Sequence, residues 1–231
     1  MIRSIVRDTI ADMPAIYWPV ARVFRSGNIV TKSTELVIEG FPRSGNTFSC
    51  RAFRHAQKKE YNIASHLHSA VQVKLACKWD IPCLVLIRDP EEAIISYMLY
   101  EGNCNIARLY KKYIKFYTQI EALRHKFIIS PFGDVTNDFG GVIDRLNNKY
   151  HTNYSRFEHT KENVKNCFDG MEQSMKDKGT YHEMRVSRPL KKRDHLKKQI
   201  KLKIDASVTQ ELQQNASDIY QDYMSYVSYD D

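Results

Sequence analysis

The chain has 231 residues, of which 42% are hydrophobic and 11% aromatic, and its formal net charge is +8 at pH 7. This length fits one α/β domain with a full core and leaves little room for a second domain. Its five cysteines are odd in number and lack metal-ligand spacing, which excludes an ordinary zinc site and indicates reduced thiols in a cytoplasmic compartment.

Residues 1–33 precede the first predicted strand. Charged residues such as Arg3, Arg7 and Asp12 interrupt the apolar positions of this stretch. No signal peptide or transmembrane segment is therefore expected. The sequence favours a helical extension that docks onto the domain, and contact with a lipid surface is the alternative.

A strand, a glycine loop and a helix are predicted next. Residues 35–39 form a short run rich in branched apolar side chains, and residues 48–58 have helix-compatible composition. Between them, residues 40–47 read Gly-Phe-Pro-Arg-Ser-Gly-Asn-Thr, which keeps the glycine spacing of a phosphate-binding loop but has Asn46 where a nucleotide kinase has lysine. Backbone N–H groups of residues 44–47 at a helix N-terminus predict an anion cradle, and a plain glycine turn is the alternative.

The loop also carries a family resemblance. Residues 42–48, Pro-Arg-Ser-Gly-Asn-Thr-Phe, resemble the Pro-Lys-Ser-Gly-Thr-Thr-Trp loop of the sulfotransferases that use 3′-phosphoadenosine 5′-phosphosulfate (PAPS). The resemblance implies a P-loop NTPase-like sulfotransferase fold. It also implies a donor site that includes Arg43, Ser44, Gly45, Asn46, Thr47 and Phe48, with Arg43 acting as a catalytic cation.

Residues 65–68, Ser-His-Leu-His, stand where the family has a Lys-Thr-His segment. By resemblance, His66 takes the proton from the acceptor hydroxyl, as a neutral imidazole can near pH 7. His68 is the alternative base, on the opposite face if the segment is extended. Ala64 replaces the family's lysine, so Arg43 or another basic residue must supply that cation.

A second anion site is predicted after another buried strand. Residues 83–87 are continuously apolar, and Arg88 follows them at the strand's carboxyl end. Residues 91–100 then predict a helix that contains Ser96. An Arg followed eight residues later by a Ser resembles the family motif that binds the 3′-phosphate, so Arg88 and Ser96 are assigned to the donor site.

The remaining segments alternate between helix and strand. This alternation predicts a three-layer α/β sandwich with a central parallel sheet. Phe132 stands where the family places an aromatic residue near the adenine, although a core position is the alternative. The expected helices are residues 70–78, 106–125, 142–150 and 207–226, and the further strand is residues 126–130.

The positive charge is concentrated late in the chain. Residues 176–203 contain 11 Lys or Arg and 3 Asp or Glu, so this window holds the whole surplus. A solvated charged face is one interpretation. By resemblance, the segment grips the 3′-phosphate through Arg185, Arg188 and Arg193. Residues 151–190 are polar with weak periodicity and are expected to form a lid.

Together these features predict a sulfotransferase that moves a sulfuryl group from PAPS to a hydroxyl of a small molecule, glycan or lipid. The product is adenosine 3′,5′-bisphosphate (PAP), the displacement is in-line, and no metal or nucleic acid is required. One alternative is a P-loop kinase or NTPase that binds magnesium through Thr47 and Asp89. The other is a noncatalytic binder of nucleotides or nucleic acids.

Overall fold

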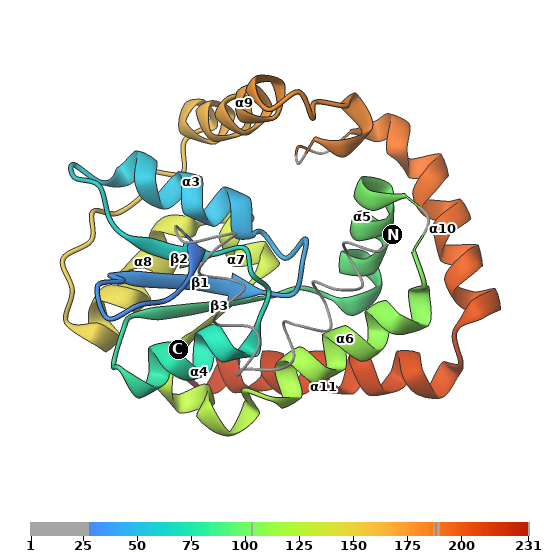
Figure 1. The fold of residues 1–231 in the computed structure, drawn as a ribbon, viewed down its shortest axis with the longest axis horizontal. Coiled ribbons are helices and arrows are strands. Elements are labelled where there is room, and N and C mark those ends of the chain that lie inside the picture. Colours follow the sequence, from blue (N-terminus) through green and yellow to red (C-terminus); the bar gives the residue numbers. More distant parts are fainter. Residues whose placement is uncertain (1–27, 103, 187, 189, 231) are drawn as a thin grey trace.

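The computed structural model describes residues 28–102, 104–186, 188 and 190–230. Its centre is a four-stranded parallel sheet in the order β2-β1-β3-β4 (Figure 1). The strands are β1 (Leu36–Gly40), β2 (Ile63–Ser65), β3 (Cys83–Ile87) and β4 (Ile128–Pro131). Most of the predicted extension, residues 1–33, lies outside the described residues.

Helices cover both faces of this sheet, because alternate residues of the strands are apolar on each side. Val37, Val85 and Ile87 face a core cluster with α4 (Ala70–Lys78), α5 (Pro90–Glu101), α6 (Ile106–Thr118) and α11 (Gln210–Asp230). Leu36, Ile38, Leu84 and Leu86 face a second cluster. It includes side chains of α3 (Asn46–Ala56), α7 (Phe132–Asn137), α8 (Phe139–Tyr150) and α9 (Lys161–Asp177). The predicted three-layer α/β arrangement with a parallel sheet is therefore confirmed.

Several helix boundaries follow from capping residues. Ser69, Asp89, Asn105, Asp138 and Thr160 each accept a backbone N–H in the first turn of the helix that they precede. The predicted helix 70–78 has the observed bounds. The helix predicted at 142–150 begins earlier, at Phe139, because Asp138 caps it ahead of two glycines that weaken the sequence signal.

The helix predicted at 106–125 ends at Thr118. Ile120 is fully buried, and a 3₁₀ helix, Glu121–Lys126, follows it. The buried Ile120 side chain lies between the end of α6 and the 3₁₀ helix, so the two helical segments are separate elements before β4 begins. The prediction of one continuous helix over this range was therefore wrong.

The polar range 151–190 contains the 17-residue helix α9, which the sequence did not predict. Its apolar residues Val164, Cys167, Phe168 and Met171 recur at helical spacing, so the expectation of weak periodicity in this range was wrong. α9 packs on α3 (Figure 1). The role of this range as a lid stays a prediction.

The C-terminal part differs from the single helix predicted at 207–226. The basic window ends in α10 (Asp194–Ser207), and α11 starts at Gln210. α10 packs on α5, while α11 packs on α6. The basic window thus lies beside the helix that carries Ser96.

No helix within the described residues combines the length and apolar character needed to cross a lipid bilayer.

Candidate functional site: two arginines and a histidine turn at the strand ends

The site is built where the parallel strands end. The order β2-β1-β3-β4 sends the chain from β1 to one side and from β3 to the other, so the loops after β1 and β3 diverge. In open α/β sheets, ligands bind at such a divergence. Residues 41–45 follow β1, and Arg88 follows β3.

The loop after β1 is held in an unusual backbone conformation. Arg43 and Gly45 have φ of 72° and 103°, in the left-handed region that favours glycine. Gly45 is the N-cap of α3, and no side chain caps this helix end. The first turn of α3 therefore presents uncapped backbone donors at the positive end of the helix dipole.

The cradle is shorter than the sequence predicted. The Ser44 N–H donates to the Phe41 carbonyl (3.2 Å), so it is not directed at a ligand. The Asn46 amide donates to the same carbonyl (3.4 Å) and closes the loop on itself. The Asn46 side-chain oxygen is buried and has no hydrogen-bond partner among the described residues.

Phe48, the remaining predicted loop contact, belongs to the core. Its ring packs 5.6 to 6.5 Å from the rings of Phe139, Phe157, His159 and Phe168. Its side chain thereby fixes α3 against α8 and α9. Only the main chain of Phe48 belongs to the uncapped first turn of α3.

The structure brings the two predicted anion motifs together. Arg43 Nε donates to Ser96 Oγ (3.1 Å), and Arg88 Nη1 donates to the Arg43 carbonyl (3.1 Å). The Arg88 guanidinium also lies over the Phe132 ring, with Cζ 4.1 Å from the ring centroid. Phe132 is thus placed between the glycine loop and Arg88, in contact range of both.

Arg185 reaches the same place from the basic window. Its Cζ lies 5.9 Å from the Tyr100 ring centroid, and Arg43 Cζ lies 4.9 Å from it. Tyr100 was not predicted as a site residue, although its place one turn after Ser96 on a helix could have suggested it. Through Tyr100, α5 holds one arginine from the loop and one from the basic window.

The other two arginines of the basic window have internal partners. Arg188 forms ion pairs with Asp169 (2.7 Å) and Glu172 (2.6 Å) of α9. Arg193 is buried and donates to the carbonyls of Glu183 and Val186. These contacts hold the segment that carries Arg185. Arg188 and Arg193 therefore have a structural role in this arrangement.

Positive charge accumulates around the loop. Burial, together with the neighbouring charges of Arg88 and Arg193, lowers the pKa of Arg43 to about 10. Burial also lowers the pKa of Arg88, while the Glu92 carboxylate 3.2 Å away opposes that shift. Both guanidinium groups stay charged at pH 7, and a bound anion would relieve their mutual repulsion.

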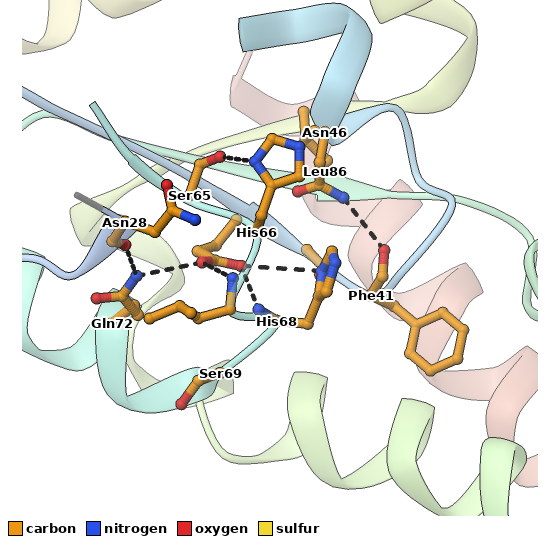
Figure 2. Close-up of polar contacts among 12 residues, drawn as sticks. Asn28, Phe41, Asn46, Ser65, His66, His68, Ser69, Gln72 and Leu86 are labelled. Atoms are coloured by element: carbon orange, nitrogen blue, oxygen red, sulfur yellow. Dashed lines mark hydrogen bonds and ion pairs between the residues drawn. The ribbon is translucent and has the colours of Figure 1, made fainter. Parts of the chain in front are cut away.

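The histidine turn closes the other side of the loop. His66 Nε2 lies 3.2 Å from Thr47 Oγ1, and His66 Nδ1 contacts Ser65 Oγ. The contact of His66 Nδ1 with Ser65 Oγ is drawn in Figure 2, and His68 Nδ1 lies 2.8 Å from the Gly40 carbonyl, at the end of β1. Both predicted histidines therefore flank the glycine loop.

The sequence missed the groups that support this turn. Glu39 is fully buried beneath it and accepts hydrogen bonds from the main chain of residues 67 and 68. A charged residue inside an otherwise apolar strand was the available signal. Tyr113 and Tyr117 donate to the carbonyls of Arg88 and Leu86, which fixes the end of β3.

Asp89, the magnesium ligand of the kinase alternative, accepts the Glu92 N–H (2.9 Å) and caps α5. Across the described residues, no three His, Cys, Asp or Glu side chains are grouped to hold a metal ion. Two surface hollows of about 360 and 660 Å³ lie near β4 and near the start of α5, and Asp89 lines the second. Neither hollow includes the glycine loop.

No known protein-family profile matches this chain, and no curated protein matches its sequence significantly.

Proposed function

We propose that this protein is a sulfotransferase that transfers a sulfuryl group from PAPS to an acceptor hydroxyl. The observation that carries the proposal is the pair of hydrogen bonds that connects the two anion motifs, Arg88 to the Arg43 carbonyl and Arg43 to Ser96. PAPS has anionic groups at both ends of its adenosine. Two adjacent anion sites on one sheet edge match that chemistry.

The described residues fit such a donor. The uncapped first turn of α3 and the Arg43 side chain would hold the 5′-phosphosulfate. Arg88, Ser96 and Arg185 would hold the 3′-phosphate, and the Phe132 ring offers an aromatic surface for the adenine. Of the predicted arginines, Arg188 and Arg193 support the segment that carries Arg185.

The expected reaction is an in-line displacement at sulfur. The acceptor oxygen forms a bond to sulfur while the bond from sulfur to the phosphate oxygen breaks, and PAP leaves. Charge that gathers on the leaving phosphate is stabilised by the α3 donors and Arg43. The acceptor proton goes to an imidazole of the turn that contains His66 and His68.

Calorimetric titration tests the proposal directly. We expect PAP to bind with micromolar or tighter affinity without a metal, and ATP and AMP to bind more weakly whether or not magnesium is present. Preferential binding of magnesium ATP would instead support a P-loop kinase or NTPase. Salt-sensitive binding of nucleic acid with no PAP binding would indicate a noncatalytic basic protein.

A further inference from the structure

A buried carboxylate supports the histidine turn from below. Glu39 Oε1 accepts hydrogen bonds from the Leu67 N–H (3.0 Å) and Gln72 Nε2 (3.3 Å), and Glu39 Oε2 accepts one from the His68 N–H (2.9 Å). All three partners are donors, so the geometry suits an ionised carboxylate, a form that burial restricts to pH values above a pKa of about 7. In Figure 2, dashed lines from Gln72 and His68 meet at the unlabelled side chain between them.

Gln72 fixes the orientation of this carboxylate from α4. Its amide nitrogen also donates to the Asn28 carbonyl (2.8 Å), and its amide oxygen accepts the Val30 N–H (2.6 Å). Gln72 is fully buried and uses both ends of its amide group. The position of Glu39 is thus set by β1, α4 and the segment before β1.

The two histidines differ in the chemistry of their ring partners. Both ring nitrogens of His66 contact hydroxyl groups, which either donate or accept. His68 Nδ1 contacts the Gly40 carbonyl, which only accepts. Neutral His68 therefore carries its hydrogen on Nδ1, and its Nε2 is the nitrogen with the lone pair.

The Glu39 carboxylate also lies close to the His68 ring. Glu39 Oε2 lies 4.0 Å from His68 Nδ1, a distance at which a carboxylate stabilises an imidazolium. The thiols of Cys50 and Cys83 also respond to the Glu39 charge, and the His66 ring centroid lies 6.4 Å from that of His68. Burial raises the pKa of both thiols, so they are neutral near pH 7.

The main chain of the turn needs this support. His66 and His68 have φ of 65° and 52°, a region that costs free energy for residues other than glycine. The two hydrogen bonds from the turn to Glu39 offset that cost on the side of His68. Glu39 therefore holds the main chain of the turn and lies close to the His68 ring.

We propose that Glu39 is a positioning residue for His68, and that His68 Nε2 is the proton acceptor of the site. This inference rests on the proposed sulfuryl transfer. As the acceptor oxygen bonds to sulfur and PAP leaves, the hydroxyl proton passes to His68 Nε2, and the imidazolium formed is stabilised by Glu39. The proton is then released to solvent, which regenerates neutral His68.

Nuclear magnetic resonance of the ¹⁵N-labelled full chain tests the pairing without any acceptor. Signals of the two histidines are assigned with His66→Gln and His68→Gln. We expect neutral His68 to be the Nδ1–H tautomer, and Glu39→Gln to lower the His68 pKa by about one unit. Glu35→Gln is the matched control, because Glu35 precedes the same strand and bonds to Asn62 and Lys59 instead.

An Nε2–H tautomer of neutral His68, or a His68 pKa that Glu39→Gln leaves unchanged, would overturn the proposal. If Glu39→Gln does not fold by circular dichroism, Glu39→Asp serves in its place, because it keeps the charge and shortens the reach. The tautomer of His68 is measured on the unmodified protein, so that criterion does not depend on whether the variants fold.

Transfer of ³⁵S from labelled PAPS to a panel of phenols and sugars tests catalysis. We expect His68→Gln to lower kcat at least about 100-fold and Glu39→Gln about tenfold, with the PAP dissociation constant unchanged. A 100-fold loss in His66→Gln with full turnover in His68→Gln would reassign the base. If PAP does not bind the unmodified chain, the proposed function fails, and the resonance experiment still judges the pairing of Glu39 with His68.

Discussion

The guanidinium of Arg88 donates a hydrogen bond to the main-chain carbonyl of Arg43 across 3.1 Å, although 45 residues separate them in the chain. The bond joins the turn after β3 to the loop after β1. It fixes Arg88 at the edge of the loop and leaves the Arg43 guanidinium to reach Ser96. Two short sequence motifs thereby form one positively charged surface.

Arg88→Ala should weaken PAP binding about 30- to 100-fold, because a charge-assisted hydrogen bond to a phosphate is worth about 2 to 3 kcal/mol. Arg88→Lys should recover only part of the loss, since an ammonium group cannot reproduce the planar contact over Phe132. Isothermal titration calorimetry measures both variants. Arg124→Ala is the control, because Arg124 also packs over tyrosine rings but pairs with Asp222 on α11. Equal affinities of Arg88→Ala and the unmodified protein would contradict the assignment.

Tyr100→Leu should weaken PAP binding about fivefold, and Tyr100→Phe should change it little. The Tyr100 ring lies within 6 Å of the Cζ atoms of Arg43 and Arg185, and such a contact contributes about 1 kcal/mol. The same titration measures this effect. Tyr181→Leu removes a comparable contact with Lys176 and should have no effect on binding. A loss with Tyr100→Phe as large as with Tyr100→Leu would show that the hydroxyl acts instead of the ring.

Gly40→Ala should destabilise the fold by about 2 to 4 kcal/mol. A Cβ at this position would lie 2.4 Å from the Leu86 carbonyl oxygen, and the two paired strands cannot separate without losing their ladder. Urea unfolding followed by circular dichroism measures the loss. Gly133→Ala is the matched control: its Cβ would meet nothing within 4 Å, and it lies in α7, so stability should stay level or rise by up to about 1 kcal/mol. Similar results for the two glycines would contradict the packing of β1 on β3.

Stability should depend on pH through Glu39 in a specific direction. Burial, opposed by the hydrogen bonds from residues 67, 68 and 72, raises the Glu39 pKa from 4.5 to about 7. The folded state therefore holds a proton that the unfolded state releases, so the Glu39 contribution to stability falls as pH rises from about 4.5 to 7. Relative to the unmodified protein, Glu39→Gln should gain about 2 to 3 kcal/mol between pH 5 and pH 8.

Urea unfolding of both proteins across this pH range measures the difference. Glu35→Gln is expected to show the opposite dependence of stability on pH. The hydrogen bond from Asn62 and the contacts with Lys59 lower the Glu35 pKa, so the stabilising contribution of Glu35 is lost as pH falls. A pH-independent difference between Glu39→Gln and the unmodified protein would exclude a raised pKa for Glu39.

Much of the sheet could be predicted from the sequence because its signals are local. The apolar runs at 35–39 and 83–87 correspond to β1 and β3 within one residue at each end. Their turn residues also marked the strand ends at which Arg43 and Arg88 lie. α9 was missed although Val164, Cys167, Phe168 and Met171 have helical spacing, because the many polar residues between them make the range polar overall.

The roles of the basic residues could not be separated in advance. Arg185, Arg188 and Arg193 share one charged window, yet the first lies over Tyr100, the second pairs with two carboxylates of α9, and the third is buried against carbonyls. A guanidinium can bind an anion, a carboxylate or a carbonyl, and its side chain is long enough to reach all three. Only the packing of α5 and α9 around the segment decides between them.

The sequence by itself determined the alternation of strands and helices and the glycine loop, since these depend on the period and conformational freedom of neighbouring residues. The tertiary structure alone decided that Arg43, Ser96 and Arg88 share one surface and that Glu39 lies buried under His68. Those relationships join residues far apart in the chain. They exist because parallel strands bring their carboxyl ends to one edge, a consequence of strand order that no local pattern contains.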